Sequence, residues 1–562
     1  MKILFKPERI FEMLEWQSAS RGRNGINKMK SIFEKFRRLF ELFWTLLTDK
    51  RERAFVRHNR RHWRSFKAFE SREEQVLVEV YPIASSILAQ SYLANALAQV
   101  NQAKIVAFDP YFGGWVRGIY NWRNRRLYSS FGARKFFGLS LNSAERAEAE
   151  KITADLLLRM KTKEDVEKLE VEGIWIGDLL YDSHLMRNVV PTIDFDDPKF
   201  AASTLAAVSY YVFWRNYLDR FKVKAAIVSH CVYYENAVIV RLCVARGIPC
   251  YQVNATSLYY VDKKHIRAYN DYLYLPREFS LLPAEEQMTG LALAKERLEL
   301  RFKGEVGVDM FYSTKSAYAN DSGERVLRPS EKVKILIATH CFFDSPHPYG
   351  NNLFTDFYEW LTFLGELSNR TDYDWYIKTH PDVLPGNAPV IAELVKKYPK
   401  FTLLPQTVSH LQIIRDGVNV VLTVFGTIAV EYAALGLNVI NASKSNPHAA
   451  YDFNLHIDDK AEYERILLDL KNLKIQIDPA KVYEHYYMYY LNRPENWLFK
   501  DYKKFVEEIG GYNAQIGPIT YEAFLKEFSP LRHEQTNKLM TQFIESKEYV
   551  LFNRQVKIAF NG

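Results

Sequence analysis

The segment from Val420 to Ala442 is the part of the chain that most constrains its fold. It reads VVLTVFGTIAVEYAALGLNVINA: an apolar strand, a turn at Gly426 and Thr427, a short helix carrying Glu431, a stop at Gly436 and a second strand. Strand, turn, helix and strand in this order form one unit of a parallel sheet. Open parallel sheets bind ligands at the turns that follow their strands. The segment therefore predicts a ligand site at the carboxyl edge of a sheet.

A second strand upstream ends in a cation and an imidazole. The run Tyr373 to Ile377 is apolar and aromatic, and Lys378, Thr379, His380, Pro381 and Asp382 follow it. Proline fixes the backbone after the strand. A lysine and a histidine at this position suit a bound phosphate better than a hydrophobic core.

In this order, the two motifs resemble the nucleotide-binding half of GT-B glycosyltransferases. The resemblance is closer to bacterial capsule and lipopolysaccharide enzymes that use CMP-activated sugars, such as Kdo transferases and bacterial sialyltransferases, which pair an HP motif with a later Ser/Thr turn. It covers mainly Val333 to Asn441, and the Ser/Thr pair is replaced here by Phe425, Gly426 and Thr427. The resemblance implies two Rossmann-like domains facing each other across a cleft, and a nucleotide-sugar donor.

Strand and helix patterns alternate from Gln75 onward and again from Val333, and a polar run from Tyr312 to Glu331 separates the two series. Repeated units of this kind predict parallel sheets covered on both faces, and thus an α/β fold. We predict an N-terminal basic amphipathic arm, a Rossmann-like acceptor domain, a Rossmann-like donor domain and a helical tail, at residues 1–74, 75–325, 326–480 and 481–562. The GT-B resemblance implies that the tail packs back on the first domain.

The bulk composition is that of a globular protein with several domains. The 562 residues are 48% hydrophobic and 25% charged, and the four cysteines have no CxxC spacing, which predicts buried free thiols. The N-terminus lacks the features of a secretory signal, and no segment has the ~18 uninterrupted apolar residues needed to cross a bilayer. We therefore expect a cytoplasmic protein, or one on the inner face of the plasma membrane.

The positive charge belongs to one segment. Residues 21–73 contain 16 Lys or Arg and 6 Asp or Glu, a balance of +10, whereas the whole chain carries +8, which leaves 8 − 10 = −2 for all other residues. Within this segment, residues 26–47 have the spacing of an amphipathic helix. Such a helix either lies on an anionic membrane or docks on the next domain. Nucleic acid is not an expected partner, because no nucleic-acid-binding fold accompanies the basic segment.

Five residues of the two motifs are candidates for donor binding. Lys378 and His380 can stabilise the charge that develops on a departing nucleoside phosphate, without a metal. Gly426 and Thr427 offer backbone amides and a hydroxyl to an anion. Glu431 lies one helical turn deeper, and the resemblance implies that it accepts a hydrogen bond from a ribose hydroxyl.

A third loop, THCFFDSPHPYG, follows the first strand pattern of the same domain and adds His340 and Asp344 as donor-contacting candidates, with His347 close by. The spacing lacks a clear fourth metal ligand, so we expect no metal and no other cofactor. A structural turn is the alternative interpretation of this loop.

Residues that act on the acceptor are expected in the first domain. Glu235 and Asp182 are the leading candidates for the catalytic base, followed by His230, with His380 as a catalytic candidate in the donor domain. Each can instead be a helix cap or a satisfied polar residue. The turn formed by Arg415, Asp416 and Gly417 is interpreted as a surface turn.

The sequence thus predicts a GT-B glycosyltransferase that moves a sugar, Kdo or another CMP-activated acidic sugar, onto a glycan or glycolipid of the bacterial surface. Three alternatives remain open: a CDP-glycerol type phosphotransferase, whose family also has an HP motif, a sugar-nucleotide epimerase, and a non-catalytic nucleotide-binding scaffold of a glycan assembly complex.

Overall fold

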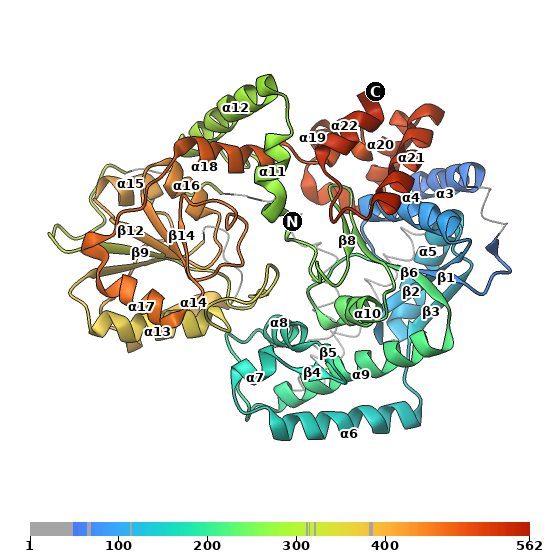
Figure 1. The fold of residues 1–562 in the computed structure, drawn as a ribbon, viewed down its shortest axis with the longest axis horizontal. Coiled ribbons are helices and arrows are strands. Elements are labelled where there is room, and N and C mark those ends of the chain that lie inside the picture. Colours follow the sequence, from blue (N-terminus) through green and yellow to red (C-terminus); the bar gives the residue numbers. More distant parts are fainter. Residues whose placement is uncertain are drawn as a thin grey trace, which may run out of the picture.

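Two six-stranded sheets organise the protein (Figure 1). The computed structural model describes residues 49–63, 69–112, 115–310, 313, 315–319, 322–380 and 386–561. Each sheet has helices on both sides, and the helical C-terminal segment lies beside the first sheet. The predicted α/β class with two largely parallel sheets is confirmed.

The first sheet has the strand order β3-β2-β1-β6-β7-β8, and every neighbouring pair is parallel except β7 and β8. Its strands are β1 Gln75–Glu79, β2 Lys104–Phe112, β3 Lys135–Leu139, β6 Val223–Val228, β7 Cys250–Val253 and β8 Leu258–Val261. The helices of this region are α4 Ala84–Val100, α5 Trp115–Ser130, α6 Ser143–Arg159, α7 Lys163–Glu167, α8 Gly177–Asn188, α9 Pro198–Arg220 and α10 Tyr234–Ala245, and a small hairpin is formed by β4 Glu170–Val171 and β5 Ile174–Trp175.

The second sheet is fully parallel, with the order β11-β10-β9-β12-β13-β14. Its strands are β9 Lys334–Ala338, β10 Asp374–Lys378, β11 Phe401–Leu403, β12 Val420–Thr423, β13 Asn438–Asn441 and β14 Leu455–His456. Its helices are α13 Phe357–Asn369, α14 Asn387–Lys397, α15 His410–Arg415, α16 Ile428–Ala434 and α17 Lys460–Leu468. Both sheets follow the 3-2-1-4-5-6 order of a dinucleotide-binding fold, which places a crevice beside the first strand of each.

The core follows from side-chain alternation along buried parallel strands. In β1, Val76 and Val78 point into the hydrophobic cluster that includes the C-terminal segment, whereas Leu77 points into the cluster formed with α6 to α10. All five residues of β1 are buried, as expected for a central strand covered on both faces.

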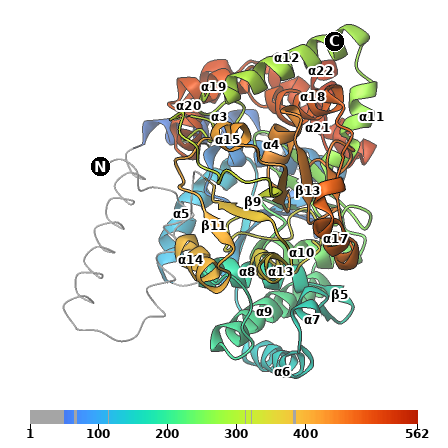
Figure 2. The ribbon, with the colours of Figure 1, turned by 90° about the vertical axis from the view of Figure 1, so that its left-hand side faces the viewer.

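After the second sheet, the chain returns to the first. Helix α18 Pro479–Tyr486 packs on α12 Ala284–Phe302 and on α16, and helix α21 Pro530–Ser546 packs on α4. Beyond α21, the Leu551 amide donates to the Leu258 carbonyl over 2.9 Å, at the edge of the first sheet. The other helices here are α11 Leu275–Ser280, α19 Tyr502–Glu508, α20 Ile519–Glu527 and α22 Asn553–Asn561. Figures 1 and 2 show α12 and the C-terminal helices on one side of the molecule and α6, α7 and α9 on the opposite side.

The basic arm is described only in part. Helix α3 Lys50–His62 packs on α5 and α20, and Phe55 stacks on Tyr521 with ring centroids 4.3 Å apart. The amphipathic helix predicted for residues 26–47 lies outside the described residues. None of the described helices is long and apolar enough to cross a membrane.

A buried histidine joins the two halves of the molecule. His347 follows β9, and its Nδ1 and Nε2 atoms lie 2.5 Å from Asp182 Oδ1 and 3.1 Å from Glu167 Oε1. The two carboxylates raise the pKa of His347 to about 10, although burial opposes the charge. Beside this group, the Tyr181 hydroxyl donates to Asp356 over 2.6 Å. Buried polar contacts therefore connect the two halves of the molecule at this point.

The four cysteines are free, as predicted; Cys231, Cys243 and Cys250 are also buried as predicted, whereas Cys341 is only half-buried. The turn Arg415–Gly417 lies at the surface as predicted, since Arg415 and Gly417 are exposed, but the side chain of Asp416 within it is buried and accepts hydrogen bonds from the Val326 and Leu327 amides. A carboxylate that satisfies two backbone donors is retained in the interior.

Candidate functional site

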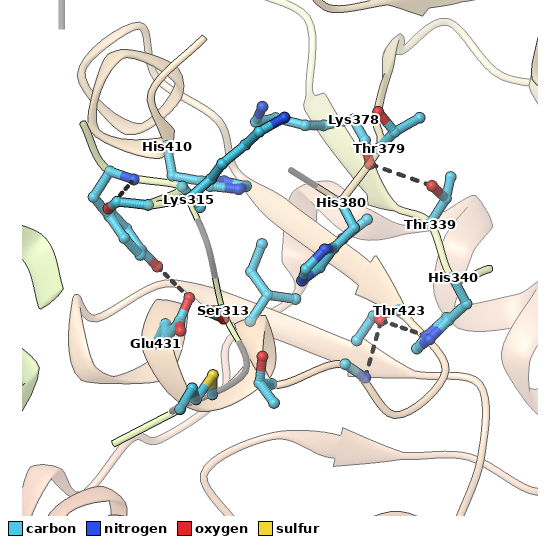
Figure 3. A pocket seen from close by; sticks show the side chains of 18 of the residues that line it. Ser313, Lys315, Thr339, His340, Lys378, Thr379, His380, His410, Thr423 and Glu431 are labelled. Carbon is cyan, nitrogen blue, oxygen red and sulfur yellow. Dashed lines mark hydrogen bonds between the residues drawn. The ribbon is translucent and has the colours of Figure 1, made fainter. Parts of the chain in front are cut away.

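A cavity of about 330 Å³ opens at the carboxyl edge of the second sheet. It lies at the end of β9 and β12, where the strand order reverses, which is the usual ligand position in such sheets. The cavity is lined by residues that follow β9, β10 and β12, by the start of α15 and α16, and by the segment after α12 (Figure 3). The predicted donor-binding residues Lys378, His380, Gly426, Thr427, Glu431, His340 and Asp344 all line it.

Lys378, the last residue of β10, supplies a buried cation. Its side chain is 2% exposed and Nζ donates to the Gln406 carbonyl over 3.0 Å. Burial lowers the pKa of Lys378 to about 8. No carboxylate among the described residues forms an ion pair with it. A buried ammonium group without a counter-ion is costly, so an anionic ligand at this position is strongly favoured.

His340 fixes the turn after β12. Its Nε2 lies 3.1 Å from Thr423 Oγ1 and within 3.4 Å of the Val424 and Phe425 amides. Burial lowers the pKa of His340 to about 3, so the ring is neutral and Nε2 accepts. Since a Cβ on Gly426 would lie 2.8 Å from Thr423 Oγ1, only glycine fits against this arrangement.

Glu431 is held by the segment between the sheets. Arg301 Nη2 donates to Oε1 and the Tyr318 hydroxyl donates to Oε2 over 2.6 Å. Burial alone would lower the pKa of Arg301, but the Glu431 carboxylate raises it above its ordinary value. Each carboxylate oxygen keeps lone pairs for a further donor. Glu431 therefore anchors one wall of the cavity and can still accept a hydrogen bond from a ligand.

Two other predicted residues connect the cavity to its surroundings. The His380 carbonyl accepts from Gln406 Nε2 over 3.0 Å, which ties the turn after β10 to the segment that also holds Lys378. Burial raises the pKa of Asp344, and the Tyr233 hydroxyl opposes this by hydrogen-bonding to it. Since Tyr233 directly precedes α10, the first sheet reaches the rim of the cavity here.

The first-domain candidates Glu235, Asp182 and His230 do not line the cavity. Glu235 pairs with Arg187 over 2.5 Å, and Asp182 pairs with His347. His230 stacks on Tyr233 with centroids 5.7 Å apart, and burial lowers its pKa to about 4. Its Nδ1 has no hydrogen-bond partner in the described part of the chain. The structure therefore places none of these three residues in the lining of the cavity.

Sequence reasoning missed Arg301, Tyr318 and His410. Arg301 ends a helix whose pattern resembles a solvated surface, and Tyr318 lies in a polar run, so neither has a local signal. His410 follows Ser409, which caps α15 in a capping box with Gln412. That S-x-x-Q pattern just before β12 is visible in the sequence and marks a helix start at the same sheet edge.

No protein-family model matches the chain, and no curated protein matches it. Among solved structures, it is similar to a UDP-GlcNAc 2-epimerase from Neisseria meningitidis bound to UDP-GlcNAc, with 12% identity and a TM-score of 0.22 over 73% of this chain and 97% of that one. It is similar to a glycosyltransferase from Rickettsia africae, with 11% identity and a TM-score of 0.22 over 81% of this chain and 100% of that one. At these TM-scores the likeness carries no functional argument, and the fold rests on the observed strand order.

The arrangement itself defines the chemistry that the cavity can support. Lys378 supplies a positive charge at one side of the cavity and Glu431 a carboxylate at another (Figure 3), and Thr427 adds a hydroxyl to the lining. This combination fits a ligand with an anionic group at one end and hydroxyl groups at the other. A nucleotide has both.

Proposed function

We propose that the protein is a GT-B glycosyltransferase that uses a nucleotide-activated sugar and a glycan or glycolipid acceptor. The observation that carries this proposal is the buried Lys378, which forms no ion pair with a carboxylate among the described residues, in a cavity at the switch point of a Rossmann-like sheet. In the proposed complex, Lys378 and His380 hold the phosphate, Thr427 adds a hydroxyl donor, and Glu431 accepts from the ribose.

The donor is proposed to be CMP-linked because of the HP motif and the later Thr427 turn. The acceptor is proposed to enter from the first sheet. There, Glu235 and Asp182 are engaged in buried ion pairs, so we favour His230 as the group that activates or orients the acceptor hydroxyl. His230→Asn should lower sugar transfer and leave nucleotide affinity unchanged; a transfer rate equal to that of the unaltered protein would exclude this role.

Lys378→Met tests the nucleotide site. The unaltered protein should bind CMP in calorimetric titrations, and the variant should bind about 10- to 100-fold more weakly, because a charged hydrogen bond contributes about 1.5–3 kcal/mol. In the unaltered protein, affinity should also decline as the pH rises through about 8, where Lys378 loses its charge. The variant should not show this decline.

Lys332→Met is the matched control, because Lys332 is an exposed lysine just before β9, near the opposite end of the same sheet, and pairs with Asp372. Equal CMP affinity in the Lys378 and Lys332 variants would refute the site. Screening CMP-Kdo, CMP-sialic acid, CDP-glycerol and UDP-GlcNAc for release of nucleotide then identifies the donor. If the protein turns over only CDP-glycerol, it is a glycerophosphotransferase and not a glycosyltransferase.

A further inference from the structure

His410 lines the cavity, and contacts with neighbouring residues hold both its backbone and its ring in place. It is the first residue of α15, its side chain is buried, and its amide donates to the Ala317 carbonyl over 3.0 Å. The ring packs against those of Tyr318 and Tyr432, each with centroids 5.5 Å away. Figure 3 shows the imidazole directed into the cavity.

The hydrogen bond between His410 and Tyr432 determines which ring nitrogen of His410 carries the proton. Nδ1 lies 2.8 Å from the hydroxyl of Tyr432, which is fully buried and whose pKa is raised by burial, so the phenol keeps its proton. If Nδ1 carried the ring proton, the Tyr432 O–H would have no acceptor among the described residues. An unsatisfied buried donor costs about 1–3 kcal/mol. Tyr432 therefore donates to Nδ1, and the ring proton is on Nε2.

The surroundings keep His410 uncharged. Burial, followed by the nearby Lys378 and His380, holds the pKa of His410 well below its ordinary value. Lys378 and His380 lie near the ring, and within the described part of the chain its Nδ1 is hydrogen-bonded to the neutral hydroxyl of Tyr432. A neutral N–H donor beside a buried ammonium group matches the several acceptor oxygens of a single phosphate.

We propose that His410, oriented by Tyr432, donates a hydrogen bond from Nε2 to the same nucleotide phosphate that Lys378 binds. This inference rests on the proposed nucleotide site and adds a neutral phosphate ligand to it. Tyr432 does not line the cavity, and acts as a positioning residue that fixes which ring nitrogen carries the proton.

Two substitutions of His410 separate its two nitrogens. In His410→Asn, the amide oxygen replaces Nδ1 as the acceptor for Tyr432, but nothing replaces the Nε2 donor. In His410→Gln, the amide nitrogen lies near the position of Nε2. The Asn variant should bind CMP about tenfold more weakly, as expected for one lost hydrogen bond, and the Gln variant should stay within about threefold of the unaltered protein.

Tyr432→Phe tests the positioning role. It should weaken CMP binding in the unaltered background and add nothing in the His410→Asn background. The ¹⁵N chemical shifts of the His410 ring should show a neutral Nε2–H tautomer that changes to a mixture in Tyr432→Phe. Thermal unfolding midpoints near that of the unaltered protein establish that the variants are folded.

The outcomes distinguish this inference from the proposed function. If His410→Asn binds CMP as tightly as the unaltered protein while Lys378→Met does not, the His410 role is wrong and the nucleotide site stands. An Nδ1–H tautomer in the unaltered protein also overturns the inference. If the unaltered protein binds neither CMP nor UDP, the proposed function and the inference both fail.

Discussion

His347→Gln should destabilise the folded protein by about 3–5 kcal/mol, the usual cost of removing one partner of a buried ion pair. The substitution leaves the buried carboxylates of Asp182 and Glu167 without their counter-ion. Since these carboxylates belong to the first half of the chain and His347 to the second, the loss should also weaken the contact between the halves. The midpoint of urea unfolding, followed by tryptophan fluorescence, measures the effect.

The control is His265→Gln. His265 also pairs with a carboxylate, at 3.2 Å, but Asp262 is partly exposed and stays solvated after the substitution. The lost pairing with Asp262 should cost no more than about 1 kcal/mol, to which the lost hydrogen bond to the Tyr274 hydroxyl and the lost stacking on Tyr549 add. Adding Asp182→Asn to His347→Gln removes one of the two buried carboxylates that have lost their counter-ion, and should restore part of the stability. Equal losses in the His347 and His265 variants would show that the buried pair does not stabilise the interface.

The pairing of His347 with Asp182 and Glu167 predicts that the stability of the folded protein depends on pH. The pKa of His347 is raised to about 10 in the folded protein, against 6.5 for the unperturbed side chain. Its contribution to stability is therefore complete below about pH 6.5 and declines as the pH rises toward 10, by up to about 1.4 kcal/mol per pH unit. The unaltered protein should lose stability over this range more steeply than His347→Gln.

The local parts of the fold were predictable because their signals lie within short runs of sequence. The strand, helix and strand predicted within Val420 to Ala442 are observed as β12, α16 and β13. Strands that are buried on both faces read as apolar runs, and the turns after them carry the polar residues. The parallel arrangement then brings Lys378 to the same edge as Thr427 and Glu431, although it belongs to a different strand-helix unit.

The partners of these residues were not predictable, because nothing local specifies them. Asp182 was a candidate base on the strength of its helix position, but its imidazole partner lies in a loop of the other sheet. Arg301 ends a charged helix, and its contact with Glu431 depends on how the chain crosses between the sheets. A pattern indicates which face of an element is buried, whereas an ion pair across two domains depends on the packing of both.

Substitutions in the Arg301–Glu431 pair can separate the contribution of Glu431 to stability from its contribution to ligand binding. Its side chains are 13% and 8% exposed, and Tyr318 completes the group. Arg301→Met and Glu431→Met should each destabilise the protein by about 3–5 kcal/mol, because each leaves a buried charge unpaired. The double variant should be far less destabilised than the sum of the two, because replacing both partners by apolar side chains removes the desolvation cost.

The double variant then isolates the role of Glu431 toward the nucleotide. If this carboxylate accepts from the ribose, the folded double variant should bind CMP about tenfold or more weakly, while Arg301→Met, which retains Glu431, should bind within a few-fold of the unaltered protein whenever it is folded. Urea unfolding and CMP titration on the same preparations give both quantities. If the double variant is stable and its CMP affinity is undiminished, Glu431 anchors the segment after α12 and does not accept a hydrogen bond from the ribose.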